Sequence, residues 1–169
     1  MIIHLKKLQQ EKKSVVWKLP DMVYKLSLCF IGLLCFSNRI FAQTKPDDIV
    51  GVWLTAGKEP AKIQIYKSGD KYFGKIVWLK NPTENSEPKI DSNNPDKRKR
   101  NQQIIGMIIL KGFQFDGDDE WDDGEIYDPE SGKTYSCYIS VKNGNTLKVR
   151  SYVGISLFGR TEIWTKTIL

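Results

Sequence analysis

Residues 133–153 read KTYSCYISVKNGNTLKVRSYV, and this stretch decides the fold class of the chain. Two β-prone segments, residues 133–141 and 146–153, flank the pair Asn143-Gly144. A two-residue type I′ turn needs a positive φ angle at both of its positions, and Asn and Gly adopt such angles at low cost. The stretch therefore predicts a β-hairpin of two adjacent antiparallel strands.

The rest of residues 47–169 shows the same succession of short β-prone segments and turn signals. In residues 61–66, Ile63 and Ile65 alternate with more polar neighbours, which is the period of a half-buried strand. Ser-Gly-Asp at 68–70 then predicts a turn into the next strand. The strands that we predict cover residues 49–54, 61–66, 72–79, 104–115, 125–127, 133–141, 146–153 and about 160–166.

Residues 81–103 interrupt this pattern. They are polar, contain three prolines and are too irregular for a long helix. Asp96 is expected to cap a single helical turn over residues 97–100. No predicted helix is long enough for a βαβ crossover, so the strands must follow one another as a meander.

Such a sheet must pair face to face with another or close on itself, and closure removes its exposed edges. We therefore predict an all-β fold, a single small up-and-down antiparallel β-barrel of about eight strands over residues 47–169. A signal peptide precedes this domain.

The signal peptide is predicted at residues 22–42. Lys25 provides a basic start, residues 26–36 are apolar, and Ala42 supplies the small residue that signal peptidase needs. The apolar run is roughly eleven residues, short of the ~20 that span a bilayer, so no stable membrane span is expected after cleavage. Residues 1–21 are interpreted as an over-extended start. A periplasmic or secreted protein follows, with an uncleaved amphipathic or buried helix as the alternative.

The charges separate along the chain. Of 26 basic and 20 acidic residues, seven basic and two acidic ones lie in residues 1–43, which leaves 19 and 18 in the remainder. A nearly neutral domain lacks the excess of positive charge that attracts a polyanion, so no nucleic-acid partner is expected.

Histidine and cysteine usage excludes several kinds of chemistry. The single histidine, His4, and two of the three cysteines, Cys29 and Cys35, precede the predicted domain. A domain without histidine cannot use a Ser-His-Asp or Cys-His arrangement or a histidine-ligated zinc. Cys137 is alone, cannot form an internal disulfide, and is predicted to be a buried, inert thiol.

Residues 116–125 form a dense acidic run that resembles a cation-binding loop only in composition. Counted from Asp118, position six is Asp123 and position twelve is Pro129, where an EF-hand has glycine and glutamate. A solvated hairpin tip is the preferred interpretation and calcium binding is the alternative, so we predict no metal site and no cofactor.

A polar group in the irregular segment allows two interpretations. Asp91, Asn94, Asp96 and Arg100 could form a ligand-binding rim in which Arg100 binds an anionic group. They could instead form a local turn in which Asp91 or Asp96 pairs with Arg100.

Arginines on late strands add to these candidates. Arg150 and Arg160 lie on late predicted strands, and either one, if it points inward, needs a carboxylate from a ligand or from Asp128. The complete set of predicted ligand-binding residues is Asp91, Asn94, Asp96, Arg100, Tyr127, Asp128, Arg150 and Tyr152.

Gly51-Val52-Trp53 in the first predicted strand, with Arg160 and Trp164 in the last, resembles the calycin (lipocalin-type) arrangement. The resemblance implies that the early tryptophan packs at one end of a barrel beneath a late basic side chain. These residues are therefore predicted to be structural.

A second resemblance covers most of the domain. It is to the bacterial secreted family known as domain of unknown function 2147, with Ser151 and Lys97 as local departures, and it implies no settled activity. The residues that carry it are 91–96 (DSNNPD), Arg100, Gly106, 124–137 (GEIYDPESGKTYSC), 147–152 (LKVRSY), 157–160 (LFGR) and Trp164.

These observations favour a non-enzymatic, exported barrel that binds a small apolar or amphipathic molecule. Two alternatives remain open. The first is a structural or interaction module of the cell envelope whose barrel is filled by its own side chains. The second is a histidine-free hydrolase that uses acidic residues.

Overall fold

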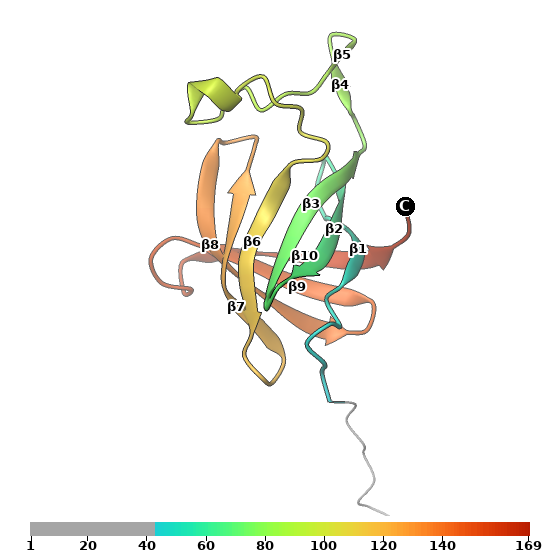
Figure 1. Ribbon diagram of the computed structural model, residues 1–169, viewed down its shortest axis with the longest axis vertical. Coiled ribbons are helices and arrows are strands. Elements are labelled where there is room, and N and C mark those ends of the chain that lie inside the picture. Colours follow the sequence, from blue (N-terminus) through green and yellow to red (C-terminus); the bar gives the residue numbers. More distant parts are fainter. Residues whose placement is uncertain (1–42) are drawn as a thin grey trace, which may run out of the picture. The chain divides into compact units, whose positions relative to one another are not determined.

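The computed structural model describes residues 43–169, which form an all-β structure (Figure 1). The predicted start region and signal peptide lie outside the described residues. Eight antiparallel strands close a barrel in the order β1-β10-β9-β8-β7-β6-β3-β2, which confirms the predicted fold class. The strands are β1 (Gly51–Leu54), β2 (Ala61–Ser68), β3 (Lys71–Leu79), β6 (Ile108–Phe115), β7 (Glu120–Asp128), β8 (Lys133–Asn143), β9 (Thr146–Tyr152) and β10 (Gly159–Thr167).

The barrel closes because apolar residues alternate along its strands. In β2, Ala61, Ile63 and Ile65 are buried, while the residues between them are half-buried on the outer face. Side chains of period two place one apolar row inside and one polar row outside. β1 then pairs with both β2 and β10, so these strands have no free edge.

The segment between β3 and β6 lies over one end of the barrel (Figure 1). It contains a two-strand hairpin, β4 (Thr83–Glu84) and β5 (Glu87–Pro88), that the sequence did not predict. It also contains the predicted helical turn, a 3₁₀ turn η1 (Lys97–Lys99) that Asp96 caps by accepting a hydrogen bond from the backbone N–H of Arg98.

Three local predictions were wrong in detail. β6 begins at Ile108 rather than at residue 104, since Gly106 adopts a φ of 93° and its N–H donates to the carbonyl of Ile76. β7 begins at Glu120 rather than at residue 125, because Trp121 pairs with Ile139 and is fully buried.

The third difference concerns the turn between β8 and β9. The hairpin forms as predicted, but neither Asn143 nor Gly144 has a positive φ angle. Instead, the Asn143 side-chain oxygen accepts a hydrogen bond from the N–H of Asn145 at 3.0 Å. This Asx turn replaces the type I′ turn that the Asn-Gly pair predicted.

The end of the barrel opposite the β3–β6 segment is closed by packed aromatic side chains. Trp53, Trp121 and Tyr72 are almost completely buried there, and each donates a hydrogen bond to the segment before β1. Trp53 Nε1 donates to the carbonyl of Ile49 at 2.8 Å and Trp121 Nε1 to that of Pro46 at 2.9 Å. The segment before β1 therefore satisfies the polar atoms of the aromatic residues that fill this end.

Asp47 extends the same arrangement. Its carboxylate accepts a hydrogen bond from the Tyr72 hydroxyl at 2.7 Å, and Lys67 Nζ lies 3.4 Å from it. The hydrogen bond from Tyr72, together with the charge of Lys67, lowers the pKa of Asp47. Burial, and then the nearby Asp47 carboxylate, raises the pKa of Tyr72.

Candidate functional site

A cavity occupies the other end of the barrel. It is enclosed by the ends of the strands and by four rim loops, residues 55–60, 80–107, 129–132 and 153–158, and it opens to solvent. The space inside the wall and between the rim loops measures about 1480 Å³. Pockets of about 300–1,000 Å³ already enclose most of a drug-sized molecule, so the cavity has room for a small ligand.

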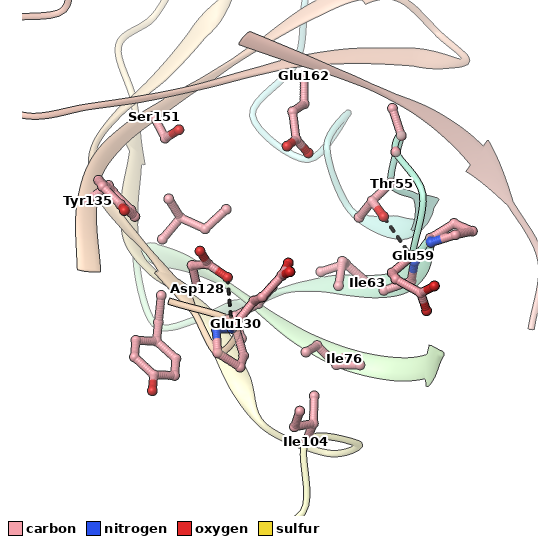
Figure 2. A pocket seen from close by; sticks show the side chains of 18 of the residues that line it. Thr55, Glu59, Ile63, Ile76, Ile104, Asp128, Glu130, Tyr135, Ser151 and Glu162 are labelled. Atoms are coloured by element: carbon pink, nitrogen blue, oxygen red, sulfur yellow. Dashed lines mark hydrogen bonds between the residues drawn. The ribbon is translucent and has the colours of Figure 1, made fainter. Parts of the chain in front are cut away.

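Apolar and polar side chains both form the cavity wall, with three isoleucines grouped on one side next to Thr55 and Glu59 (Figure 2). Figure 2 shows Ile63, Ile76 and Ile104 together on one side of the space, and Asp128, Tyr135 and Ser151 on the other. Glu162 points into the space from β10. Further apolar contacts come from Leu79, Ile109 and Ile126.

One face of β10 runs from the cavity mouth to its floor. Arg160, Glu162 and Trp164 are two residues apart, so they share a face of the strand, and all three line the cavity. The Trp164 ring is buried, and its Nε1 donates to Glu162 Oε2 at 3.2 Å. The Arg160 guanidinium lies 3.2 Å from Glu162 Oε1, with 76% of its side chain exposed against 30% for Glu162.

The predicted polar group of the rim segment is a buried network. Asp91 is fully buried and Asn94 nearly so. The Asp91 carboxylate accepts hydrogen bonds from the Asn94 side-chain amide and, at 2.8 and 2.9 Å, from the Tyr127 hydroxyl. Burial first, and then this hydrogen bond, raises the pKa of Tyr127 to about 12. The network ties the rim segment to β7.

Arg100 and Asp96 have separate local roles. Arg100 Nε donates to the carbonyl of Asn94 at 2.8 Å, and the Asp96 carboxylate pairs with Arg98 at 3.0 Å. The hydrogen bonds from Arg98 lower the pKa of Asp96. Neither carboxylate pairs with Arg100, so the pairing proposed in the local-turn interpretation is wrong, although the residues do form a turn. Asp91, Asn94, Asp96 and Arg100 do not line the cavity, and their role toward a ligand stays a prediction.

The other predicted ligand residues divide between cavity and outer surface. Tyr127, Asp128 and Tyr152 line the cavity. The Asp128 carboxylate is held by the Glu130 N–H at 3.0 Å and the Ser131 hydroxyl at 2.6 Å.

Arg150 lies on the outer face of β9, since the alternate residues Leu147 and Val149 are buried. Its guanidinium donates to the carbonyls of Ser156 and Leu157 at 2.8 and 3.2 Å and to the Thr161 hydroxyl at 2.7 Å. These bonds hold the β9–β10 rim loop. Because Arg150 faces outward, the inward carboxylate partner considered for it is not needed.

Comparison with known proteins relates this geometry to a family. A profile described as an uncharacterized protein conserved in bacteria, the domain of unknown function 2147, matches residues 51–166. The chain belongs to this family. The match includes the barrel strands, the buried Asp91 network and the cavity-lining residues of β10. A comparison with curated proteins gave no match.

Among solved structures, the chain is similar to the protein HP1028 from the human pathogen Helicobacter pylori, which is described as a member of the lipocalin family. The two are 20% identical, with a TM-score of 0.64, over 70% of this chain and 82% of the other. At this identity the similarity concerns the fold, and it confirms the calycin-like architecture of this member of the domain of unknown function 2147 family.

The closed end of this family member follows the calycin pattern with one change of residue. Lys166 Nζ lies 5.4 Å from the centre of the Trp53 ring, so Lys166, and not Arg160, is the cation over the early tryptophan. The strand register explains the difference, because Trp53 pairs with Lys166 across β1 and β10, whereas Arg160 pairs with Ser151. Gly51 has a φ of 146°, which suits glycine.

Several cavity residues were missed at the sequence level, namely Tyr135, Ser151 and Glu162. The alternation Arg160-Glu162-Trp164 in the last strand could have identified Glu162, because its position on one face with Trp164 predicts an inward carboxylate.

Cys137 is buried as predicted. Its burial, and secondarily the Glu162 charge, raises its pKa to about 12, so little reactive thiolate exists at neutral pH. Within residues 43–169, no three acidic, cysteine or histidine side chains are grouped as a metal ion would need. That part of the chain also holds no helix with the length and apolar character of a membrane span.

Proposed function

We propose that this protein is exported to the periplasm or beyond the cell, and there binds a small apolar or amphipathic molecule in the open end of its barrel. The observation that carries the proposal is the open cavity of about 1480 Å³, in which a group of isoleucines lies beside inward polar side chains (Figure 2). Concave sites that combine apolar and polar side chains in this way are typical of small-molecule binding.

The filled-barrel alternative applies to only one end of the barrel. Trp53, Trp121 and Tyr72 fill the closed end, while the space beyond Trp164 is open to the rim. A purely structural barrel has no need of an open space that exposes Ile104 and Ile126 in part.

The hydrolase alternative has one observation in its favour, since Asp128 and Glu162 both reach the cavity (Figure 2). Each carboxylate is already held by groups of the barrel itself. Binding is therefore the function that the arrangement supports best.

Native mass spectrometry tests the proposal on protein purified from the cell envelope or culture medium. The expected result is a chain that begins near Gln43 and carries a species of a few hundred daltons, which organic denaturation removes. A chain that retains residues 22–42 would contradict export by cleavage.

A matched pair of variants locates the bound species. Ser151→Trp places a large ring in the cavity and should abolish the bound mass, whereas Thr165→Trp on the exposed face of β10 should leave it unchanged. A bare wild-type mass, repeated after addition of envelope lipid extract, would refute binding and favour the structural module.

A further inference from the structure

The positions of charged groups along the cavity carry information on the kind of ligand. The basic residues that line it are Lys58, Lys80, Lys89 and Arg160, and each lies in a rim loop or within the first two residues of β10. Lys89 is also 3.8 Å from the Glu59 carboxylate. Among the described residues that line the cavity, all the basic side chains therefore lie at its mouth.

The innermost charged group is the Glu162 carboxylate. It lies one inward position below Arg160 and one above the buried Trp164 on the same face of β10. Figure 2 shows this carboxylate directed into the open space.

Glu162 retains capacity to accept hydrogen bonds. One of its oxygens is 3.2 Å from Arg160 and the other accepts from Trp164 Nε1 at 3.2 Å. A carboxylate offers about four lone-pair sites, so both oxygens can accept further donors from the cavity. Arg160 is mostly exposed at the mouth, where water screens its charge.

Resting on the binding function proposed above, we infer that the ligand is a cationic amphiphile. Its protonated amine or similar donor group lies against Glu162, and its apolar body lies against Ile63, Ile76 and Ile104. An anionic head at this depth would meet the Glu162 carboxylate, and the neighbouring Arg160 guanidinium is already paired with that carboxylate. Hydrogen bonds from a protonated amine to a carboxylate are strengthened by the opposite charges of the two groups, and they therefore favour a cationic head over a neutral one.

Three probes of equal chain length separate head-group charge from apolar burial: dodecylamine, dodecanol and dodecanoate. Each is titrated into purified protein at pH 7 as a monomer, below the micellar concentration of the amine and the carboxylate and below the solubility limit of the alcohol, with isothermal calorimetry as the readout. We expect one site per chain and about ten-fold tighter binding of the amine than of the alcohol, equivalent to ~1.4 kcal/mol. The carboxylate should bind no better than the alcohol.

Two glutamate variants test the role of Glu162. Glu162→Gln keeps the shape and removes the charge, so it should abolish the preference for the amine and leave dodecanol binding unchanged. Glu125→Gln changes an exposed glutamate on β7 and serves as the matched control, with the wild-type preference retained.

The outcomes distinguish the two proposals. If dodecanol or dodecanoate binds as tightly as dodecylamine, or if Glu162→Gln keeps the preference, the cationic inference is refuted and the binding function stands. Tighter dodecanoate binding that Arg160→Gln removes would point to an anionic head at the mouth. No binding of any probe would refute both.

Discussion

Removal of the Asp91 carboxylate is the sharpest test of how the rim segment is held. Asp91 is fully buried and accepts hydrogen bonds from two side-chain donor groups, the Asn94 amide and the Tyr127 hydroxyl, whose single proton is shared between the two carboxylate oxygens. A hydrogen bond to a charged group contributes about 1.5–3 kcal/mol, and a buried donor left unpaired costs a further 1–3 kcal/mol. Asp91→Ala should therefore lower the free energy of unfolding by about 3 kcal/mol or more. Tyr127→Phe, which removes one donor group, should cost about 2 kcal/mol.

Urea unfolding at pH 7, followed by tryptophan fluorescence, measures both values. The double variant should cost about 1–2 kcal/mol less than the sum of the single ones, because both substitutions remove the same hydrogen bonds. Asp118→Ala, at the exposed tip between β6 and β7, is the control and should cost less than about 0.5 kcal/mol. The reasoning is refuted if Asp91→Ala costs no more than this control, or if the two network substitutions are additive.

Three further expectations concern the remaining parts of the barrel. In the folded protein the pKa of the Tyr127 hydroxyl is raised to about 12 from the ordinary 10.0. Its contribution to stability is therefore complete below pH 10 and is lost as the pH rises toward 12. In urea titrations at alkaline pH, the unfolding free energy of Tyr127→Phe should depend less on pH over that window than that of the wild type. Gly124→Ala places a methyl group 2.3 Å from the buried Phe113 ring and should cost about 1–3 kcal/mol. A calorimetric melt without a lower midpoint would contradict this. Lys166→Ala should cost about 0.5–1 kcal/mol through loss of the cation over the β1 tryptophan, whereas Arg160→Ala, exposed at the mouth, should change urea stability less. Equal effects would argue against the assigned cation.

Strand periodicity predicted the barrel because one row of each strand had to be buried. Ile63 and Ile65 were assigned to a half-buried strand from their spacing alone, and both are buried in β2. The same rule could also have placed Arg150 on the outer face, since Leu147 and Val149 on either side of Lys148 define the buried row. Its assignment to a ligand came from residue type instead of spacing.

The sequence did not predict the start of β7, because most of its first residues are acidic and acidic residues are typical of exposed turns. Glu120 and Asp122 belong to the acidic run that was assigned to a turn, yet they flank the buried Trp121. Burial, and then neighbouring carboxylates, raise the pKa of both side chains. Only the partner strands make this placement stable, and partners are not visible in local sequence.

The candidate cavity depended on long-range arrangement in the same way. Tyr135 and Glu162 come from β8 and β10, which are not neighbours in the barrel, so no local motif joins them. The Asp91-to-Arg100 group was recognisable as a local cluster, but its partly buried partner Tyr127 is 36 residues away from Asp91. Sequence spacing could identify the residues of this group, and only the fold shows that they bond mainly to one another.

Tyr127 links stability to the cavity, because it lines the cavity and also donates to the buried Asp91 carboxylate. Loss of its hydroxyl should therefore loosen the rim segment that encloses the proposed ligand, in addition to its cost in stability. Lys166 lies at the closed end over Trp53, so its loss should destabilise the barrel without altering the rim. If stability alone governed ligand binding, the two variants would bind equally tightly when compared at temperatures where their unfolding free energies are the same. If the rim must be held in place, the Tyr127 variant would bind less tightly.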